Sequence, residues 1–350
     1  MNLNLPTIKV PVLQNRVFDS TESAKNSDYG YMEIRKNNNT GIYENGLFDE
    51  SKLIYDSNYD NEQSNSQAFQ RHLNEVMLIL SPFMIDKRVI EIGCGKGKFL
   101  EMLLAEGFDA FGCDPTYTGT NDRVIKSFFS KEINLIGDVI ILRHVLEHIK
   151  DPIKFLNQIA EVNNYKGLIY IEVPDLNWII NNLAFFDFFY EHVNYFTPSD
   201  FEKIFLKVFK KGLFFGDQYQ FVLADLSSLQ LPPYKDDSDT DFEQILFEPS
   251  DKLIERLLSS QKPLFIWGAA SKGVILTLHL QSKGIVIQNL IDINPNKQNK
   301  FTALSAIEII SPDTFIDIGS DSNLIIVNPN YEQEIREITK LVNNISFIVL

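Results

Sequence analysis

The amino-acid sequence predicts an α/β protein with two parallel-sheet domains and a small N-terminal cap, and three observations carry this prediction. From about Ala68 onward, short apolar runs alternate with segments of helical periodicity, which indicates a parallel sheet with helices on both faces. A Pro-rich acidic stretch, residues 231–241, interrupts this alternation once, as a domain boundary does. The residues before Ala68 are polar, with short strand-like pieces and no long helical signal.

The length supports this division, because 350 residues of which 44% are apolar can bury more than one core. We expect a cap over 1–67, a first α/β domain over 68–230, a linker and helix over 231–262, and a second α/β domain over 263–350. Aromatic residues in the cap, such as Tyr43 and Phe48, favour packing of this segment over disorder.

In the first α/β domain, Phe69, Leu73, Val76, Met77 and Leu80 recur at helical spacing and predict an opening helix. Strands are expected at 88–92, 110–113, 139–142 and 168–173, helices at 98–106 and 152–162, and a closing strand pair at 213–215 and 219–224. The second domain is expected to have strands at 264–267, 286–291, 324–327 and 347–350, and helices at 252–258, 272–282 and 332–342.

Charge and cysteine content exclude several classes of protein. A formal net charge of -15 repels a phosphate backbone, so we expect no nucleic-acid partner. Two cysteines, Cys94 and Cys113, make neither a disulfide framework nor a four-cysteine zinc site, so we expect a metal-free protein. No secretory signal is visible, and polar residues interrupt the aromatic stretch 178–190. We therefore expect a soluble, cytoplasmic protein without membrane insertion, whose oligomeric state the sequence does not reveal.

The segment 89–100 holds a glycine-rich turn between a strand and a helix. Gly93, Gly95 and Gly97 allow a tight turn and a close approach of the backbone to a ligand. Dinucleotide-binding loops place their third glycine one position later. The alternating glycines, with Glu91 two residues before the first, instead resemble the S-adenosylmethionine loop of class I methyltransferases. Asp114, at the end of the next strand, is suited to accept the ribose hydroxyls.

Further cofactor contacts follow from position or from this resemblance. Ser127 and Phe128 lie where the third strand ends and are expected to flank the adenine. The segment 138–152, with its His-x-x-Glu-His sequence, resembles the fourth strand of the class and implies that Arg143 and His144 lie near the methionine half. Glu147 and His148 are equally open to a structural role that fixes the loop. The complete set of expected cofactor-binding residues is Glu91, Gly93, Cys94, Gly95, Gly97, Asp114, Pro115, Ser127, Phe128, Arg143, His144, Tyr59, Gln63 and Ser64.

A Glu-His pair surrounded by aromatic residues, Glu191 and His192, follows the fifth strand of this sheet. Substrates bind at the carboxyl ends of such strands. A carbon atom must lose a proton before it attacks a methyl group, and a histidine is suited to remove it. The alternative is that the pair caps the helix that begins near Pro198.

Three blocks in this order resemble the bacterial C-methyltransferases of nucleotide-linked 4-keto-deoxysugars: 91–97, 190–196 and the second glycine loop 266–273, continued by 291–298. The resemblance runs from about Ser51 to the C-terminus and includes a stretch near Tyr59 that covers the cofactor. It implies S-adenosyl-L-methionine as cofactor and a nucleotide-linked sugar as substrate, in polysaccharide or natural-product biosynthesis. The residues it implies are His192, Glu191 and Tyr190 for catalysis and Asp175, Tyr195, Ser271 and Lys272 for substrate binding, the last two near a diphosphate.

The sequence departs from this family at two places. The cysteines of an N-terminal zinc site are absent, and Phe189 stands where the sugar enzymes often have a tyrosine. O- or N-methylation of a glycan precursor or another small molecule therefore stays open as an alternative. An NAD-dependent sugar oxidoreductase is opposed by the glycine spacing, and a non-catalytic scaffold by the presence of Glu91, Asp114 and His192. The second glycine loop is also open to interpretation as a packing turn.

Overall fold

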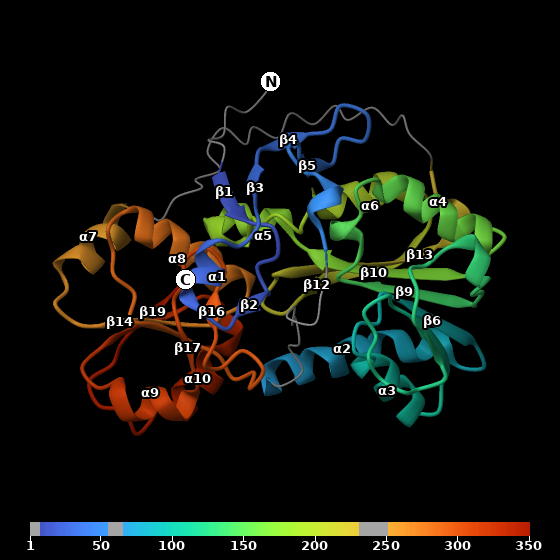
Figure 1. The fold of residues 1–350 in the computed structure, drawn as a ribbon. Helices are drawn as coiled ribbons and strands as arrows, with labels where there is room; N and C mark the ends of the chain where they lie inside the picture. Colours follow the sequence, from blue (N-terminus) through green and yellow to red (C-terminus); the bar gives the residue numbers. More distant parts are fainter. Residues whose placement is uncertain (1–7, 55–65, 231–250) are drawn as a thin grey trace.

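A computed structural model describes residues 8–54, 66–230 and 251–350. Two α/β halves lie side by side, and residues 8–54 lie between them along one edge (Figure 1). The expected contacts of Tyr59, Gln63 and Ser64, and most of the expected linker, fall outside the described residues. No described helix is both long and apolar enough to cross a membrane.

The first half is built on a seven-stranded sheet with the order β12-β13-β10-β9-β6-β7-β8. Its strands are β6 (Arg88–Ile92), β7 (Asp109–Cys113), β8 (Val124–Ile125), β9 (Val139–Arg143), β10 (Leu168–Pro174), β12 (Val208–Phe214) and β13 (Tyr219–Asp225). Strands β8, β7, β6, β9 and β10 are parallel, whereas β13 runs antiparallel to both β10 and β12. The predicted α/β class with a mostly parallel sheet is confirmed.

Helices cover both faces of this sheet, as Figure 1 shows. The helices of this half are α2 (Gln67–Met84), α3 (Lys98–Ala105), α4 (Pro152–Val162), α5 (Leu176–Asn181) and α6 (Pro198–Ile204), with the 3-10 turns η2 (Lys131–Ile133), η3 (Leu146–His148), η4 (Phe185–Asp187) and η5 (Leu226–Ser228). Apolar residues of α2 and α3 form one core with the sheet, and those of α4 and α6 form the core on its other face. Burial of these two apolar surfaces is the main force that holds the half together.

The second half has a parallel sheet with the order β17-β15-β14-β18-β19. Its elements are α7 (Asp251–Ser259), β14 (Leu264–Trp267), α8 (Ser271–Ser282), β15 (Asn289–Ile291), β16 (Phe301–Thr302), β17 (Ile309–Ile310), α9 (Pro312–Ile318), β18 (Asn323–Ile326), η6 (Pro329–Tyr331), α10 (Glu332–Ile338) and β19 (Ser346–Val349). Residues of α8 pack on one face of this sheet and residues of α9 and α10 on the other.

The N-terminal cap folds by docking rather than around a metal-binding cysteine set. It contains β1 (Ile8–Pro11), β2 (Val17–Phe18), α1 (Thr21–Lys25), β3 (Tyr29–Met32), β4 (Ile34–Lys36), β5 (Tyr43–Asn45) and η1 (Glu50–Lys52). Strand β2 pairs with β16 of the second half, and β5 pairs with β11 (Asn194–Tyr195) of the first. Cap residues therefore share one apolar core with residues from both halves.

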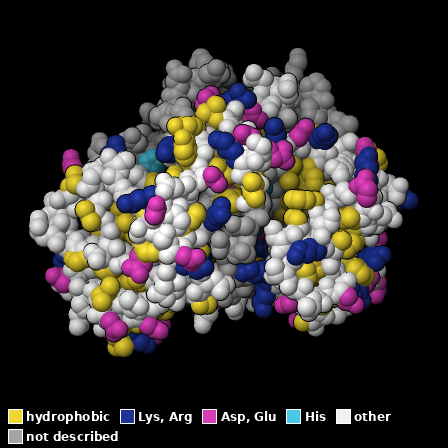
Figure 2. All heavy atoms as spheres, viewed as in Figure 1, with side chains coloured by type: hydrophobic (Ala, Val, Ile, Leu, Met, Phe, Trp, Pro, Cys, Tyr) yellow, Lys and Arg dark blue, Asp and Glu magenta, His cyan; other side chains and the backbone are white. Residues whose placement is uncertain are grey.

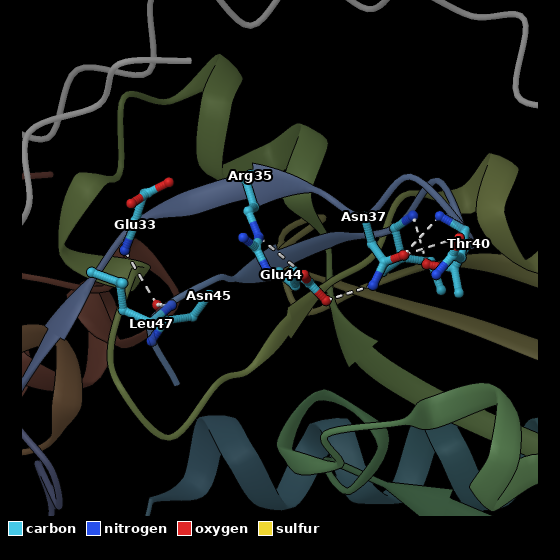
Figure 3. A network of polar contacts seen from close by, with 9 residues as sticks. Glu33, Arg35, Asn37, Thr40, Glu44, Asn45 and Leu47 are labelled. Atoms are coloured by element: carbon cyan, nitrogen blue, oxygen red, sulfur yellow. Dashed lines mark hydrogen bonds and ion pairs between the residues drawn. The ribbon is translucent and has the colours of Figure 1, made fainter. Parts of the chain in front are cut away.

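Polar side chains hold the β4–β5 hairpin of the cap together (Figure 3). Arg35 donates to Glu44 across the strands at 3.1 Å, and Asn37 donates to the same carboxylate at 2.7 Å. The Asn45 side-chain oxygen accepts the backbone N–H groups of Glu33 and Leu47. The two Asn45 bonds satisfy backbone N–H groups that a short hairpin leaves unpaired, and the Glu44 bonds join side chains across the hairpin.

Some element bounds differ from the sequence prediction. Strand β12 begins at Val208, five residues before the predicted start, because it is an edge strand whose lysines face solvent and break the apolar pattern. Strand β15 begins at Asn289 rather than at Val286, whose side chain is 82% exposed.

Acidic and basic side chains are interspersed over the face that Figure 2 shows.

Candidate active site

One cavity of about 1270 Å³ opens between the two halves and the cap. The first sheet reverses its strand order between β6 and β9, and the second reverses between β14 and β18. Ligands of open α/β sheets bind at the carboxyl ends of strands beside such reversals. Both reversals open into this cavity, since Gly95, Asp114 and Arg143 line it from the first half and Gly268 and Asn328 from the second.

The glycine loop after β6 has a backbone that requires glycine. Gly93, Gly95 and Gly97 all have positive φ, between +55° and +82°. A Cβ at Gly93 would lie 2.4 Å from the Val145 side chain, whereas a Cβ at Gly95 would meet no atom within 4 Å. Gly95 thus leaves its space open to the cavity, and Gly97 starts α3 without a side-chain cap. The loop offers open space and a helix N-terminus to a ligand.

Two carboxylates stand beside this loop. Asp114 follows β7 and lines the cavity, where its Oδ2 accepts the Gly95 N–H at 2.8 Å. Glu91 is 3% exposed, and its Oε2 has no hydrogen-bond partner among the described residues. Burial raises the pKa of Glu91 to about 7 against the opposing charge of Arg143. An orphaned carboxylate oxygen here fits the ammonium group of the methionine half of the cofactor, and Asp114 fits its ribose.

The other expected cofactor residues divide by position. Cys94, Pro115, Phe128, Arg143 and His144 line the cavity together with the loop. Ser127 is outside the cavity lining, and its hydroxyl donates to the Phe128 carbonyl at 3.1 Å, so its contact with the adenine stays a prediction.

A buried ionic cluster lies behind Arg143 and His144. At its centre is Glu172, whose Oε1 lies 2.8 Å from His72 Nε2 and 3.1 Å from His144 Nε2. Although burial opposes its charge, Arg143 and the histidines hold the pKa of Glu172 well below its usual range. His144 also lies 3.3 Å from Glu147. Burial disfavours its charged form, but Glu147 and Glu172 together raise the pKa of His144 to about 9, so it is a cation at neutral pH.

His192 lines the cavity and is buried against aromatic rings. The Phe189 ring lies 3.9 Å from it, centroid to centroid. Burial lowers the pKa of His192 well below its usual range, and the charges of His148, His144 and Lys272 lower it further. The ring is therefore neutral at pH 7 and able to accept a proton.

The structure changes the carboxylate that is expected to support this histidine. Glu147 Oε1 lies 4.0 Å from His192 Nε2, and the Glu147 side chain is 1% exposed. Glu191 also lines the cavity, but its Oε1 accepts the backbone N–H of Gln14 at 3.1 Å. His148 lies beneath the same loop, where Nδ1 is 2.9 Å from the Glu191 carbonyl oxygen. Glu147 is thus the carboxylate beside the histidine.

Three expected site residues, Tyr190, Tyr195 and Asp175, lie outside the cavity lining, and their predicted roles stay predictions. The Tyr190 hydroxyl accepts the Asp49 backbone N–H at 2.8 Å, and its ring packs against Gly30 of the cap. The Tyr195 hydroxyl donates to the Phe189 carbonyl at 3.2 Å, and Asp175 caps α5. The sequence of the 190–196 block does not show which way the side chains of Tyr190 and Tyr195 point.

The alternative that Glu191 and His192 cap α6 is wrong. The first turn of α6 is closed by Thr197 and Asp200, each of which bonds the backbone of the other. This capping box satisfies the N–H groups that a capping pair would otherwise serve. The Glu-His pair is therefore not needed to start this helix.

The second glycine loop brings Ser271 and Lys272 to the cavity as expected. Gly273 packs so closely that a Cβ there would lie 1.8 Å from the Gly268 carbonyl oxygen. Lys272 Nζ lies 2.6 Å from Asp187 Oδ2, so its charge is compensated within the protein. Two further lining residues lie beside this loop: Asn15, which no sequence motif indicates, and Lys297, which stands in the block 291–298 but has no expected role there.

Two groups of side chains among the described residues have the composition of a metal site. They are His72 with His144 and Glu172, and His148 with His192 and Glu147. In both groups a histidine or carboxylate already contacts a protein partner. The expectation of a metal-free protein stays a prediction.

Comparisons with known proteins find methyltransferase domains in both halves of this chain. Residues 64–208 match the family model described as a methyltransferase domain, and residues 242–349 match that of the C-methyltransferase C-terminal domain. The C-methyltransferase NovU of Streptomyces niveus is 30% identical over 122 residues. That alignment covers 31% of this chain and 29% of NovU, less than a third of the relative's length.

Solved structures that resemble part of the chain include two methyltransferases. A SAM dependent methyltransferase from Archaeoglobus fulgidus is 19% identical, with a TM-score of 0.34, over 45% of this chain and 99% of its own. The magnesium protoporphyrin IX methyltransferase (ChlM) from Synechocystis PCC 6803, solved with bound SAM, is 13% identical, with a TM-score of 0.33, over 45% of this chain and 79% of its own.

Proposed function

We propose that this chain, a class I S-adenosylmethionine-dependent methyltransferase with a C-methyltransferase C-terminal domain, methylates a carbon atom of a nucleotide-linked keto-deoxysugar. The observation that carries the proposal is the shared cavity, where the cofactor loop, a neutral buried His192 and the second glycine loop meet. We further propose that the reaction belongs to polysaccharide or natural-product biosynthesis in the cytoplasm, without a nucleic-acid partner.

When bound, S-adenosylmethionine supplies an electrophilic methyl group on a sulfonium. The backbone of the loop around Gly95 and the carboxylates of Glu91 and Asp114 are the groups that would hold it.

His192 has the properties of a base that removes a proton from the carbon next to a ketone. Its neutral ring can accept the proton, and its place on the cavity wall gives substrate access to it. The positive charges that keep the His192 ring neutral also oppose the positive charge that the ring gains when it takes the proton, so they do not strengthen it as a base. A positive charge close to the enolate oxygen would favour the negative charge that develops there.

Exchange of the substrate's α-proton with solvent deuterium tests this function directly. A keto-sugar nucleotide and S-adenosylhomocysteine, which cannot donate a methyl group, should give exchange with the wild-type protein. His192→Ala should lose exchange and methylation together, by roughly 10²- to 10⁴-fold, as a missing general base does. Binding of S-adenosylhomocysteine serves as the folding control and should change little. Methylation by His192→Ala at the wild-type rate would exclude His192 as the base.

O- or N-methylation remains the second candidate because of Phe189. Its ring packs near His192 at the cavity wall and has no hydroxyl to bind an enolate oxygen. An oxygen or nitrogen acceptor needs no carbon-bound proton to be removed. Methylation that depends on His192 without any α-proton exchange would therefore favour this candidate.

A further inference from the structure

Three lysines of the second half line the cavity, Lys272, Lys297 and Lys300, and two of them have a carboxylate within 4.0 Å. Lys272 forms an ion pair with Asp187 at 2.6 Å and donates to Gln218 at 2.9 Å. Lys297 is 3% exposed, and its Nζ contacts two neutral oxygens, Asn15 Oδ1 and the Ala269 carbonyl, each at 3.3 Å. Within 8–54, 66–230 and 251–350, no carboxylate lies within 4.0 Å of Lys297 Nζ.

A buried ammonium group without a counter-charge is costly, because burial removes the hydration that stabilises the charge. The carboxylate of Asp292 accepts the N–H groups of Ala269 and Asn294 and forms no ion pair within 4.0 Å of Lys297 Nζ. Lys297 nevertheless belongs to the cavity lining. An anion in the cavity would supply the missing charge.

The cap holds this lysine and the second glycine loop together. Asn15 donates from Nδ2 to the Ser271 hydroxyl at 3.1 Å and accepts from Lys297 at its Oδ1. Because the Ser271 oxygen accepts this bond, its own proton is left to donate toward the cavity. Ser271 also opens α8, a 12-residue helix without a side-chain cap bond, whose first N–H groups favour negative charge.

We propose that Lys297, Ser271 and the N-terminus of α8 form an anion subsite for a diphosphate ester, and that Asn15 is its positioning residue. Identifying that ester as the diphosphate of the sugar nucleotide rests on the proposed function. Lys272, which the sequence suggested for this role, instead has Asp187 as its counter-ion. The subsite lies on the second sheet's side of the cavity, so it anchors the nucleotide end and leaves the sugar to face His192.

Calorimetric titration of the full chain with UDP, dTDP and inorganic pyrophosphate, in the presence of S-adenosylhomocysteine, tests this subsite. The wild-type protein should bind at least one of these diphosphates, and uridine or thymidine without phosphate should bind far more weakly. Lys297→Met should weaken diphosphate binding about 10-fold or more, as loss of a hydrogen bond to a charged group does. Lys300→Met is the matched control, because Lys300 lines the same cavity but is more exposed and lies 3.9 Å from Asp19. It should change binding less than about threefold.

Asn15→Ala keeps the charge of Lys297 and that of the bound diphosphate. It should therefore weaken diphosphate binding by a smaller factor than Lys297→Met does. Lys297→Met should melt at the same or a higher temperature without ligand, because methionine retains the apolar stem and removes an uncompensated charge. Diphosphate should then raise the melting temperature of the wild-type protein but not that of Lys297→Met. Unchanged binding in Lys297→Met, a lower melting temperature of its ligand-free form, or no diphosphate binding by the wild-type protein would each overturn the proposal.

The two proposals can fail separately. If diphosphates bind through Lys297 but no keto-sugar nucleotide is methylated, the subsite stands and the proposed reaction is wrong. If Lys297→Met methylates a keto-sugar nucleotide with an unchanged KM, the reaction stands and the subsite is wrong.

Discussion

Replacing Glu147 by glutamine removes the carboxylate that lies between two histidines of different protonation state. Glu147 lies 3.3 Å from His144 Nδ1 and 4.0 Å from His192 Nε2. The substitution Glu147→Gln keeps the size of the side chain and removes its charge. We expect the pKa of His144 to fall, because one of the two carboxylates that overcome its burial is lost.

The magnitude follows from the wild-type pKa. A change from 6.5 to about 9 corresponds to about 3 kcal/mol of preferential stabilisation of the imidazolium. Glu147 and Glu172 share this stabilisation, so Glu147→Gln should lower the pKa of His144 by about one unit, or about 1 to 2 kcal/mol. The raised pKa stabilises the folded protein fully below pH 6.5, and this contribution is lost as the pH rises toward 9. In Glu147→Gln the loss should be smaller and complete at a lower pH.

Titration of the histidine ring signals by NMR measures this effect directly. The chain has 5 histidines, so single His→Gln variants can assign every ring. His144 should titrate near pH 9 in the wild-type protein, and His192 should stay neutral down to acidic pH. Glu191→Gln is the matched control, because it removes a charge from the same wall while glutamine can still accept the Gln14 N–H. Equal His144 pKa values in the wild-type protein and Glu147→Gln, or a wild-type value near 6.5, would refute the reasoning.

Three further predictions concern the cofactor loop, the cap and metal content. Gly95→Val should abolish S-adenosylhomocysteine binding, as measured by calorimetry. The control Gly107→Val should retain binding, because Gly107 also has a positive φ and open space around its Cβ but lies outside the cavity lining. Equal loss of binding in both variants, or tight binding of NAD instead, would contradict the loop assignment. Tyr190→Phe should lower the free energy of unfolding by about 1 kcal/mol through loss of the bond from Asp49 and leave kcat nearly unchanged; a hundred-fold fall in kcat would instead support its predicted catalytic role. Elemental analysis should find no stoichiometric metal, and one equivalent of zinc bound through His148 and His192 would show that this prediction is wrong.

Local sequence patterns predicted much of the fold because they act within a few residues. Strand β6 and helix α4 have the predicted bounds. Asp151 accepts the Lys154 N–H and Pro152 stands at the first helical position, so the start of α4 is encoded in adjacent residues. The edge strand β12 was partly missed because solvent, rather than a core, selects its side chains.

The cofactor loop was also readable from sequence, since three glycines with positive φ are a local requirement of one turn. The sequence by itself thus determined the α/β class, the order of the strands along the chain and the loop beside Asp114. Periodicity and spacing carry this information because hydrogen bonds and sterics between near neighbours enforce it.

Only the tertiary structure decided which charges meet. Asp187 compensates Lys272 across 85 positions, and Asn15 reaches Lys297 across 282. Glu147, rather than the adjacent Glu191, lies beside His192 for the same reason. These pairings depend on how two sheets and a cap pack against one another. The residue spacing within a single segment indicates which side chains share a face, but not which other segment that face contacts. The chemistry of the cavity therefore follows from contacts between segments that are far apart in the chain.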